Sequence, residues 1–337
     1  MYNDLLVYDA HSLNVGDVLS FEKIIEDIKN IKPKIILFLS ILEYEMPHVN
    51  DRNEYDKLNN LLIENNIQFY ILIGSENSDN LEEFQKKSEF KYIFWPTSML
   101  HYFYNRIEEH LVTYDTNRNF EKLYVCFNGK ARCHRVKLID SLFKNSLFNY
   151  GQISWNQLTK DFNEGQKCNF QFWNEEILSI DNNNFFQKLY DNTSFFDLVS
   201  ETTSSHSLRT EKIYRPLLFE QIFLCLGCKD INKNLKNYGF EIFEEIFNYD
   251  FDSKITINGR IDGIIENIKN LKDKNLNELY NIIKPKLKHN KKRAIEIVEN
   301  DEYIPEILIQ LFKNYRDSFG KYIKFYNLDY ILKNKLK

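Results

Sequence analysis

The chain is 337 residues long, which exceeds one average domain and predicts two. Its hydrophobic content of 43% and aromatic content of 15% are sufficient to build sizeable cores. A formal net charge of -5 excludes a global positive field that would draw the whole molecule to nucleic acid.

The first third of the chain alternates between strand and helix patterns. Short apolar runs predict strands at 5–8, 35–40, 69–73 and 92–95, and helical spacing predicts helices at 21–31, 54–65 and 81–87. Strands that alternate with helices imply a parallel sheet with right-handed crossovers. We therefore expect residues 1–118 to form one Rossmann-like domain, followed by a hinge in the polar stretch 113–118.

A second alternating series follows. It predicts strands at 123–127, 151–155, 195–200 and 224–227, with helices at 134–143, 186–190 and 213–223. After residue 252 the pattern is helical, at 261–271, 276–283, 292–299 and 303–312. The predicted fold class is α/β, with Rossmann-like domains at 1–118 and 119–300 and a helical segment, 301–337, packing across both. We expect the two domains to face each other, because open parallel sheets bind ligands at their carboxyl ends.

The charge is unevenly distributed. Residues 284–337 carry a net charge of +6, which leaves -11 on the rest of the chain. We interpret the basic segment as the solvated face of helices. A phosphate-rich or membrane-surface partner is the alternative.

Two basic loops begin predicted helices. NGKARCHR, residues 128–135, follows one strand, and RTEK, residues 209–212, follows the polar loop after another. Arginine binds phosphate through two hydrogen bonds, lysine binds it as a point charge, and helix N-termini complement negative charge. The two loops together predict a site for a nucleoside diphosphate, whereas the alternative is that they only decorate the surface.

Other motifs point away from common chemistries. The chain contains neither G-x-G-x-x-G nor G-x-x-x-x-G-K-[ST], so no nicotinamide dinucleotide fold or P-loop is predicted. Cys225 and Cys228 match C-x-x-C but lack a second ligand pair, and we assign them to packing. Asp250 and Asp252 form a D-x-D pair, a weak metal candidate, and we expect no metal.

The cell compartment is predicted from what the sequence lacks. No run approaches the roughly 18 apolar residues of a membrane span, and MYNDLLVYDA lacks the pattern of a secretory signal. Five scattered cysteines do not form a disulfide framework. We expect a cytoplasmic protein without a transmembrane segment.

A family resemblance is carried by residues 200–227, SETTSSHSLRTEKIYRPLLFEQIFLCLG. This segment resembles the donor-binding motif of the alpha-1,3-fucosyltransferase family and its viral and bacterial relatives. Residues 126–142, CFNGKARCHRVKLIDSL, are similar to the strand, Asn, Arg and helix unit of the same family. Residues 237–240 and 249–250 resemble a downstream part of related glycosyltransferase-like proteins of phages and large viruses. The resemblance spans 123–252.

The resemblance implies a glycosyltransferase of the GT-B architecture, with two facing Rossmann-like domains. It would move a sugar from a nucleotide-diphosphate sugar, a co-substrate, to an acceptor hydroxyl, with inversion and without metal or cofactor. Arg135 and Lys212 would bind the diphosphate, and Glu211 the ribose or sugar. The implied donor-binding residues are Asn128, Arg132, Arg135, Ser200, Glu201, Thr210, Glu211 and Lys212. The acceptor would be a glycan, or a hydroxymethylated DNA base in a viral protein.

The acceptor half offers no motif to transfer. Inverting sugar transfer needs a carboxylate or histidine that takes the acceptor proton. Our first candidates are Glu43 and Glu45, just past a predicted strand, with Asp9, His11 and His48 in reserve. The alternative function is a non-catalytic module that binds a nucleotide or a partner. The donor sugar, nucleotide base and oligomeric state are left open.

Overall fold

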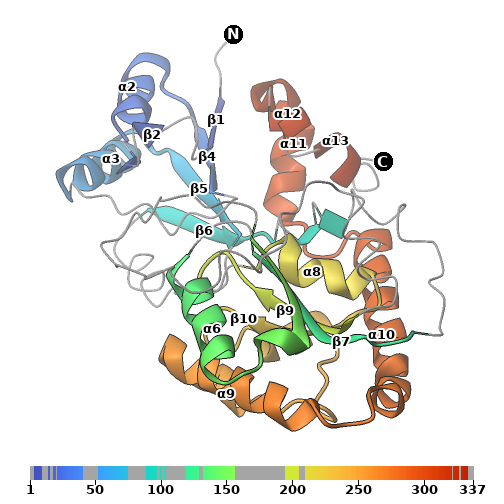
Figure 1. Ribbon diagram of the computed structural model, residues 1–337. Helices are drawn as coiled ribbons and strands as arrows, with labels where there is room; N and C mark the ends of the chain where they lie inside the picture. The colour runs from blue at the N-terminus through green and yellow to red at the C-terminus, as the bar shows by residue number, and fades with distance from the viewer. Residues whose placement is uncertain are drawn as a thin grey trace. The chain divides into compact units, whose positions relative to one another are not determined.

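The computed structural model of the chain describes residues 4–9, 14–15, 18–19, 21–40, 52–74, 89–96, 99–100, 102–103, 118–128, 132–155, 194–204, 209–320, 322–325 and 328–332. The chain forms two compact units, one of residues 1–104 with 297–337 and the other of residues 105–296. Each unit contains a parallel sheet of four strands flanked by helices (Figure 1). The predicted α/β class with two Rossmann-like halves is therefore confirmed at this level.

The sheet of the first unit follows the order of the chain. Its strands are β1 (Leu5–Asp9), β4 (Ile35–Ser40), β5 (Gln68–Ile73) and β6 (Phe90–Phe94), in the order β1-β4-β5-β6. A short antiparallel pair, β2 (Asn14–Val15) and β3 (Val18–Leu19), lies between β1 and α2 (Glu22–Ile31) along the chain, and α3 (Arg52–Asn65) connects β4 to β5. Four parallel strands in sequential order contain no point at which the strand order reverses.

Periodicity explains how the helices of this unit dock. In α2, Ile24, Ile25 and Ile28 are buried on one face, and the helix ends at Lys32, whose left-handed φ of 53° precedes Pro33. These isoleucines belong to a core cluster with Phe38 of β4 and Phe69 of β5. The predicted strands and helices of this unit are confirmed where the structure describes them, and the predicted helix 81–87 lies outside the described residues.

The C-terminal helices belong to the first unit. They are α11 (Glu306–Phe319), α12 (Tyr322–Phe325) and α13 (Leu328–Ile331). α11 packs against β1 and buries Leu308, Phe312 and Phe319. The compact units thus divide the chain near residue 296, inside a helix, and return the chain end to the first unit. The expected packing of 301–337 across both domains stays a prediction.

The sheet of the second unit is wound in two directions. Its parallel strands are β7 (Lys122–Asn128), β8 (Gly151–Trp155), β9 (Ser194–Ser200) and β10 (Ile222–Leu226), in the order β10-β9-β7-β8. From β7 the chain runs to β8 on one side, and then continues on the other side with β9 and β10. The strand order therefore reverses between β7 and β9, which makes this pair a topological switch point.

Helices cover both faces of this sheet. α6 (Cys133–Lys144) connects β7 to the segment before β8, and α8 (Glu211–Leu218) connects β9 to β10. Because these right-handed crossovers run in opposite directions, α6 and α8 lie on opposite faces (Figure 1). α9 (Ile257–Leu271) packs beside α6. The remaining elements are α10 (Leu276–Glu299) and the 3₁₀ turns η2 (Phe148–Tyr150), η3 (Lys233–Tyr238) and η4 (Asp250–Ser253).

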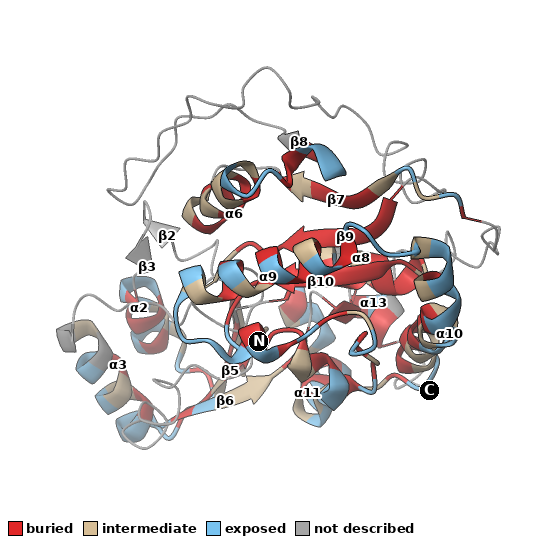
Figure 2. Cartoon of the chain, turned by 60° about the horizontal axis from the view of Figure 1, so that its bottom comes forward, coloured by how far each residue is buried: buried red, intermediate tan, exposed pale blue. Residues whose placement is uncertain are grey.

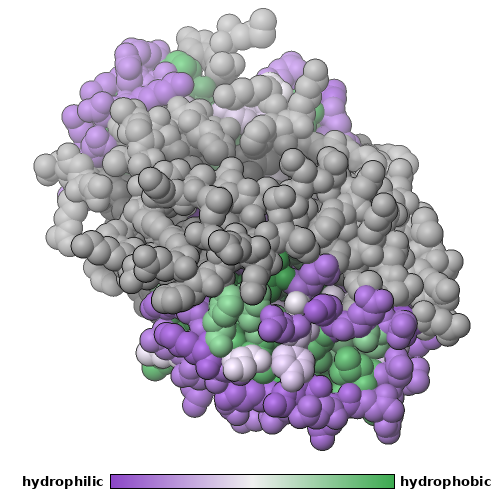
Figure 3. Space-filling view, in the orientation of Figure 1, coloured by the Kyte–Doolittle hydropathy of each residue, from purple (hydrophilic) through white to green (hydrophobic). Residues whose placement is uncertain are grey.

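The core of the second unit is centred on β9. All seven residues of this strand are buried, as are all five of β10 (Figure 2). A strand covered on both faces reads as a near-continuous apolar run, and FFDLVS follows that pattern except at Asp197 and Ser200. In the view of Figure 3, hydrophilic side chains cover most of the described surface, with smaller apolar patches between them.

Two predicted helix boundaries in this unit are wrong. The helix predicted at 213–223 ends at Leu218, because Glu220 adopts a left-handed φ of 51° and the Gln221 N–H bonds to the Pro216 carbonyl. The helices predicted at 276–283 and 292–299 are one helix, α10, which continues through Pro285. Ile283, Leu287, Ala294 and Ile297 are buried along that helix, and their packing outweighs the helix-breaking tendency of proline.

Candidate functional site

The switch point of the second unit brings two predicted residues together. Asn128 ends β7 and Ser200 ends β9. The parallel register pairs Val125 with Asp197, and carried forward it sets Asn128 level with Ser200 at the carboxyl end of the sheet. Ligands of open α/β sheets bind in the crevice at such a point. We name the residues around this end, Asn128, His134, Arg135, Ser200, Glu201, Thr202, Thr210 and Lys212, the switch-point site.

Two polar atoms at these strand ends are buried. Asn128 Oδ1 and Ser200 Oγ have no hydrogen-bond partner within the part of the chain that the structure describes. The two residues are only 2% and 1% exposed, and the Asn128 amide donates to Cys126 Sγ at 3.3 Å. A buried polar group left unpaired costs about 1–3 kcal/mol. The register sets these two groups level on neighbouring strands at the switch point.

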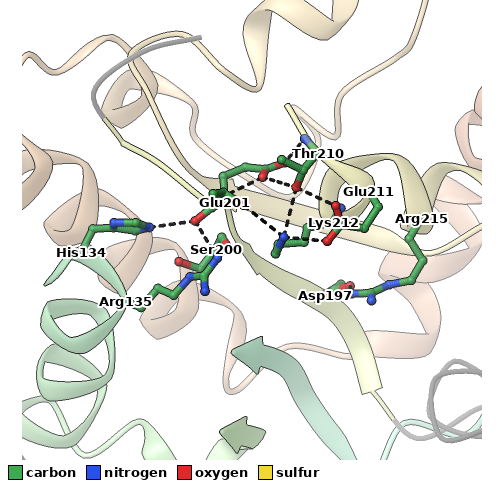
Figure 4. A network of polar contacts seen from close by, with 10 residues as sticks. His134, Arg135, Asp197, Ser200, Glu201, Thr210, Glu211, Lys212 and Arg215 are labelled. Carbon is green, nitrogen blue, oxygen red and sulfur yellow. Dashed lines mark hydrogen bonds and ion pairs between the residues drawn. The ribbon is translucent and has the colours of Figure 1, made fainter. Parts of the chain in front are cut away.

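Glu201 is the anchor of the site. Its buried carboxylate accepts the Thr202 N–H at 3.1 Å, the Thr210 N–H at 3.0 Å and the Thr210 hydroxyl at 2.6 Å (Figure 4). These bonds tie the end of β9 to the start of α8, across the polar loop. Burial raises the pKa of Glu201, and the charge of Lys212 and the bonds from Thr210 oppose that rise. The carboxylate thus accepts hydrogen bonds from within the protein, and its role as a donor contact stays a prediction.

Lys212 stands at the N-terminus of α8. Its ammonium donates to Thr202 Oγ and Thr210 Oγ, both at 3.2 Å, and to Glu211 Oε1 at 2.6 Å. Thr210 is the N-cap of α8, since its hydroxyl accepts the Lys212 N–H at 3.5 Å. The Lys212 side chain is 21% exposed, while the Glu211 side chain is 53% exposed. An anion at the helix N-terminus can therefore replace the exposed Glu211 carboxylate on Lys212.

Arg135 reaches the same strand end from the opposite face of the sheet. It lies in the first turn of α6, and its guanidinium donates to the Ser200 and Glu201 carbonyls at 3.2 and 3.0 Å. Burial, and then repulsion from Arg132, lowers the pKa of Arg135 to about 10, which leaves it charged at neutral pH. Figure 4 shows Arg135 and Lys212 on either side of Ser200 and Glu201.

His134 adds a neutral ring to this face. Its Nε2 lies 2.8 Å from the Glu201 carbonyl oxygen, to which it donates as the Nε2–H tautomer. Burial lowers the pKa of His134 to about 4, with further lowering from the charges of Arg135, Arg132 and Arg260. The ring is therefore uncharged at neutral pH.

The remaining predicted residues fall in different places. Arg132 is the N-cap of α6, where its carbonyl accepts the first helical bonds. Asp9 is the last residue of β1, in the first unit. Glu43, Glu45, His11 and His48 lie outside the described residues, so the proposed catalytic base stays a prediction. The switch-point site contains six of the eight predicted donor residues, while Arg132 is the N-cap of α6 and Glu211 is the first residue of α8. Their binding of a donor stays a prediction.

Two weaker motifs are explained by packing. Asp252 is buried and accepts the backbone N–H groups of Asn232 and Lys233 and the Asn232 amide, whereas Asp250 is exposed. Among the described residues no group of three or more acidic, His or Cys side chains is placed to hold a metal. Cys225 and Cys228 are both buried. Of the D-x-D pair, Asp252 therefore stabilises the turn after β10.

Sequence reasoning missed Arg260, a buried residue in the first turn of α9 that donates to the Ser204 carbonyl beyond β9. The helix was predicted to begin at residue 261, one residue after Arg260 and four residues after the actual start of α9. One signal in the sequence could have identified Arg260. A cation in the first turn of a helix opposes the helix dipole, so its presence there indicates a specific partner.

Comparisons with known proteins add no family. No protein-family model matches the chain, and no curated protein matches it. No helix in the described parts is long and apolar enough to cross a membrane.

Proposed function

We propose that the protein is a glycosyltransferase that takes a nucleotide-diphosphate sugar as donor and transfers the sugar to an acceptor hydroxyl. The observation that carries this proposal is the switch-point site, where two buried polar side chains lie at matched strand ends between two cationic residues. This combination suits a ligand with both hydroxyl or base groups and a diphosphate.

Each residue has a role in this mechanism. Lys212 and the N-terminus of α8 bind one phosphate group, and Arg135 supplies positive charge from the α6 side. Negative charge develops on the diphosphate as the bond to the sugar breaks, so fixed cations lower the barrier. Asn128 Oδ1 and Ser200 Oγ hydrogen-bond polar groups of the nucleoside or sugar. A carboxylate of the first domain, Glu43 or Glu45, takes the proton of the acceptor hydroxyl.

The architecture and the partners belong to the same proposal. The domains face each other in the GT-B manner, and the reaction inverts the sugar without metal. The acceptor is a glycan, or a hydroxymethylated DNA base in a viral protein. The family resemblance of residues 123–252 supports this assignment, because its motif residues are those that gather at the switch point. A non-catalytic nucleotide-binding module would keep the same site without a base.

The binding part of the proposal is tested with nucleotides. We expect UDP, GDP or another nucleoside diphosphate to raise the melting temperature and to bind in calorimetry. Lys212→Ala should weaken that binding by about 1.5–3 kcal/mol, the scale of a charge-assisted hydrogen bond. The matched control is Lys236→Ala, which removes an exposed lysine of the same unit that pairs with Glu244.

The outcomes separate the alternatives. A melting temperature that no nucleotide or nucleotide sugar changes contradicts the proposal. Nucleotide binding that Lys212→Ala leaves intact removes the switch-point site from the function. A mass spectrum of products from a panel of nucleotide sugars and acceptors then tests transfer. Binding without any product over the whole panel favours the non-catalytic module.

A further inference from the structure

We infer that Arg260 is a positioning residue of the switch-point site, which holds the segment 202–204 so that Thr202 keeps Lys212 in place for the diphosphate. The inference rests on the proposed function and extends it to a residue outside both basic loops. It is carried by the hydrogen bonds that Arg260 makes to three separate carbonyl groups.

Arg260 joins α9 to the end of β9. Its Nη1 donates to the Lys254 and Ile255 carbonyls at 2.7 and 3.0 Å, and its Nη2 donates to the Ser204 carbonyl at 3.0 Å. The residue is only 3% exposed, although it is an arginine in the first turn of a helix. Because the helix dipole disfavours a cation there, the contacts to these carbonyls are what stabilise the guanidinium.

The segment that Arg260 holds leads directly to Lys212. Ser204 lies two residues beyond Thr202, whose Oγ accepts the Lys212 ammonium at 3.2 Å. The backbone of Thr202 is fixed on its other side by the Glu201 carboxylate, which accepts its N–H. The residues 202–204 are therefore held at one end by Glu201 and at the other by Arg260. Removing the second contact loosens the backbone that carries Thr202, and we expect its hydroxyl to hold Lys212 less firmly.

The contact also sets the orientation of the ammonium. Lys212 has three acceptors, Thr202, Thr210 and the exposed Glu211. When an anion replaces Glu211, the two threonines remain and aim the third N–H at the incoming oxygen. Without a fixed Thr202, the ammonium keeps only Thr210 as a fixed partner, and the flexible lysine loses part of its preorganisation.

The experiment measures nucleotide affinity in a double-mutant cycle on the full chain. Isothermal titration calorimetry with the nucleoside diphosphate that binds the unmodified protein best is carried out on Arg260→Met, Lys212→Ala and the double variant. We expect Arg260→Met to lower the affinity about tenfold, within the range of coupled neighbours. The double variant should bind no more weakly than Lys212→Ala alone, because Arg260 acts through Lys212. Thr202→Val should reproduce the loss seen in Arg260→Met.

A matched control separates positioning from general damage. Arg118→Met removes another buried arginine. This arginine donates to the Phe219 carbonyl and to Gln221, next to the start of β10 and thus at the amino end of the sheet, away from the site. The substitution should lower the melting temperature and leave nucleotide affinity unchanged. Arg260→Lys should restore part of the affinity, since a lysine donates to some of the same carbonyls.

Three results would overturn the inference. Wild-type affinity in Arg260→Met, measured while Lys212→Ala is impaired, removes Arg260 from the site and leaves the proposed function standing. Losses that multiply in the double variant show that Arg260 contacts the ligand by itself. An equal loss of affinity in Arg118→Met assigns the effect to stability. A wild-type protein that binds no nucleotide contradicts the proposed function instead.

Discussion

At the scale of single residues, two glutamates of similar appearance in the sequence have different surroundings in the structure. Glu201 and Glu211 both suggest ligand contacts, but only Glu211 is exposed. The Glu201 carboxylate accepts three hydrogen bonds from Thr202 and Thr210. Burial and hydrogen bonding thus assign one glutamate to structure and leave the other facing solvent beside Lys212. Sequence distinguishes the residue types, but not which carboxylate is used internally.

His134 leads to a prediction about pH. Its pKa in the folded chain is about 4, below the ordinary value of 6.5, because burial disfavours the charged ring. The folded state then binds fewer protons than the unfolded state between these values. The stability contributed by the neutral ring is complete above pH 6.5 and is lost as the pH falls toward 4. We expect this single group to cost up to about 3 kcal/mol at pH 4.

The measurement is the free energy of unfolding by denaturant, from pH 7 to pH 4, in the unmodified chain and in His134→Gln. Glutamine keeps an N–H donor for the Glu201 carbonyl but does not titrate. The difference between the two chains should shrink or reverse as the pH falls, because only the histidine is destabilised. Parallel curves would show that His134 does not titrate in this range.

At the scale of elements, α9 is fixed by close approach to η4. A Cβ atom on Gly263 would lie 2.1 Å from Phe251 Cβ, so any side chain there must move the helix from the turn. Asp252 in η4 in turn holds Asn232 and Lys233, which follow β10. α9 carries Arg260 to the site, and its placement therefore depends on a glycine that has no chemistry of its own.

This packing gives a matched pair of substitutions on one helix. Gly263→Ala should lower the free energy of unfolding by about 1–3 kcal/mol, the cost of overpacking. Gly259→Ala should be nearly neutral, because its nearest neighbour is Thr256 Oγ1 at 3.2 Å and alanine favours the helix by about 1 kcal/mol. Denaturant unfolding of both variants checks the pair, and an equal effect at both positions would contradict this account of the docking.

The charges of α10 are explained at the same scale. Lys286 pairs with Glu245 at 2.8 Å, Lys291 with Glu220 at 3.1 Å and Lys292 with Glu296 at 3.3 Å. Two of these carboxylates, Glu245 and Glu220, lie outside residues 284–337, so two of the six excess positive charges read from the C-terminal sequence are balanced by these pairs. These pairs favour the interpretation as a helical surface over a phosphate-rich partner at this helix.

At the scale of the whole molecule, the chain end completes the first unit. α11 packs against β1 and buries Leu308, Phe312 and Phe319. The second unit, 105–296, has its own sheet and core. Because each unit has its own core, each should respond separately to the loss of its own elements.

A truncation tests this division. A chain that stops after Glu299 lacks α11, α12 and α13, and we expect the first unit to lose its cooperative unfolding because the apolar residues against β1 are uncovered. Nucleotide should still raise the melting temperature of the second unit. Thermal unfolding with and without nucleotide, together with limited proteolysis, separates the two units. A first unit that stays protease-resistant would show that the C-terminal helices contribute little to it.

The sequence by itself determined the elements and most of their limits. The apolar runs at 35–40 and 195–200 and the helical spacing at 134–143 are local patterns, and each is set by which side chains must leave water. The basic loops before α6 and α8 were also visible, because charge at a helix start needs no tertiary information. The predicted helix boundaries were wrong near Glu220, where a residue with left-handed φ interrupts an apolar run, and at Pro285, where packing outweighs the helix-breaking tendency of proline.

Only the tertiary structure decided the site. Asn128 and Ser200 are far apart in the chain and meet because β9 inserts beside β7, after the chain has passed through β8. The use of Glu201 as an anchor and the arrival of Arg260 from α9 depend on hydrogen bonds between distant segments. Strand order and such contacts arise from the packing of whole elements, which no local pattern of residues encodes. Local sequence patterns therefore determine the alternation of strands and helices, whereas the switch point is a property of the assembled sheet.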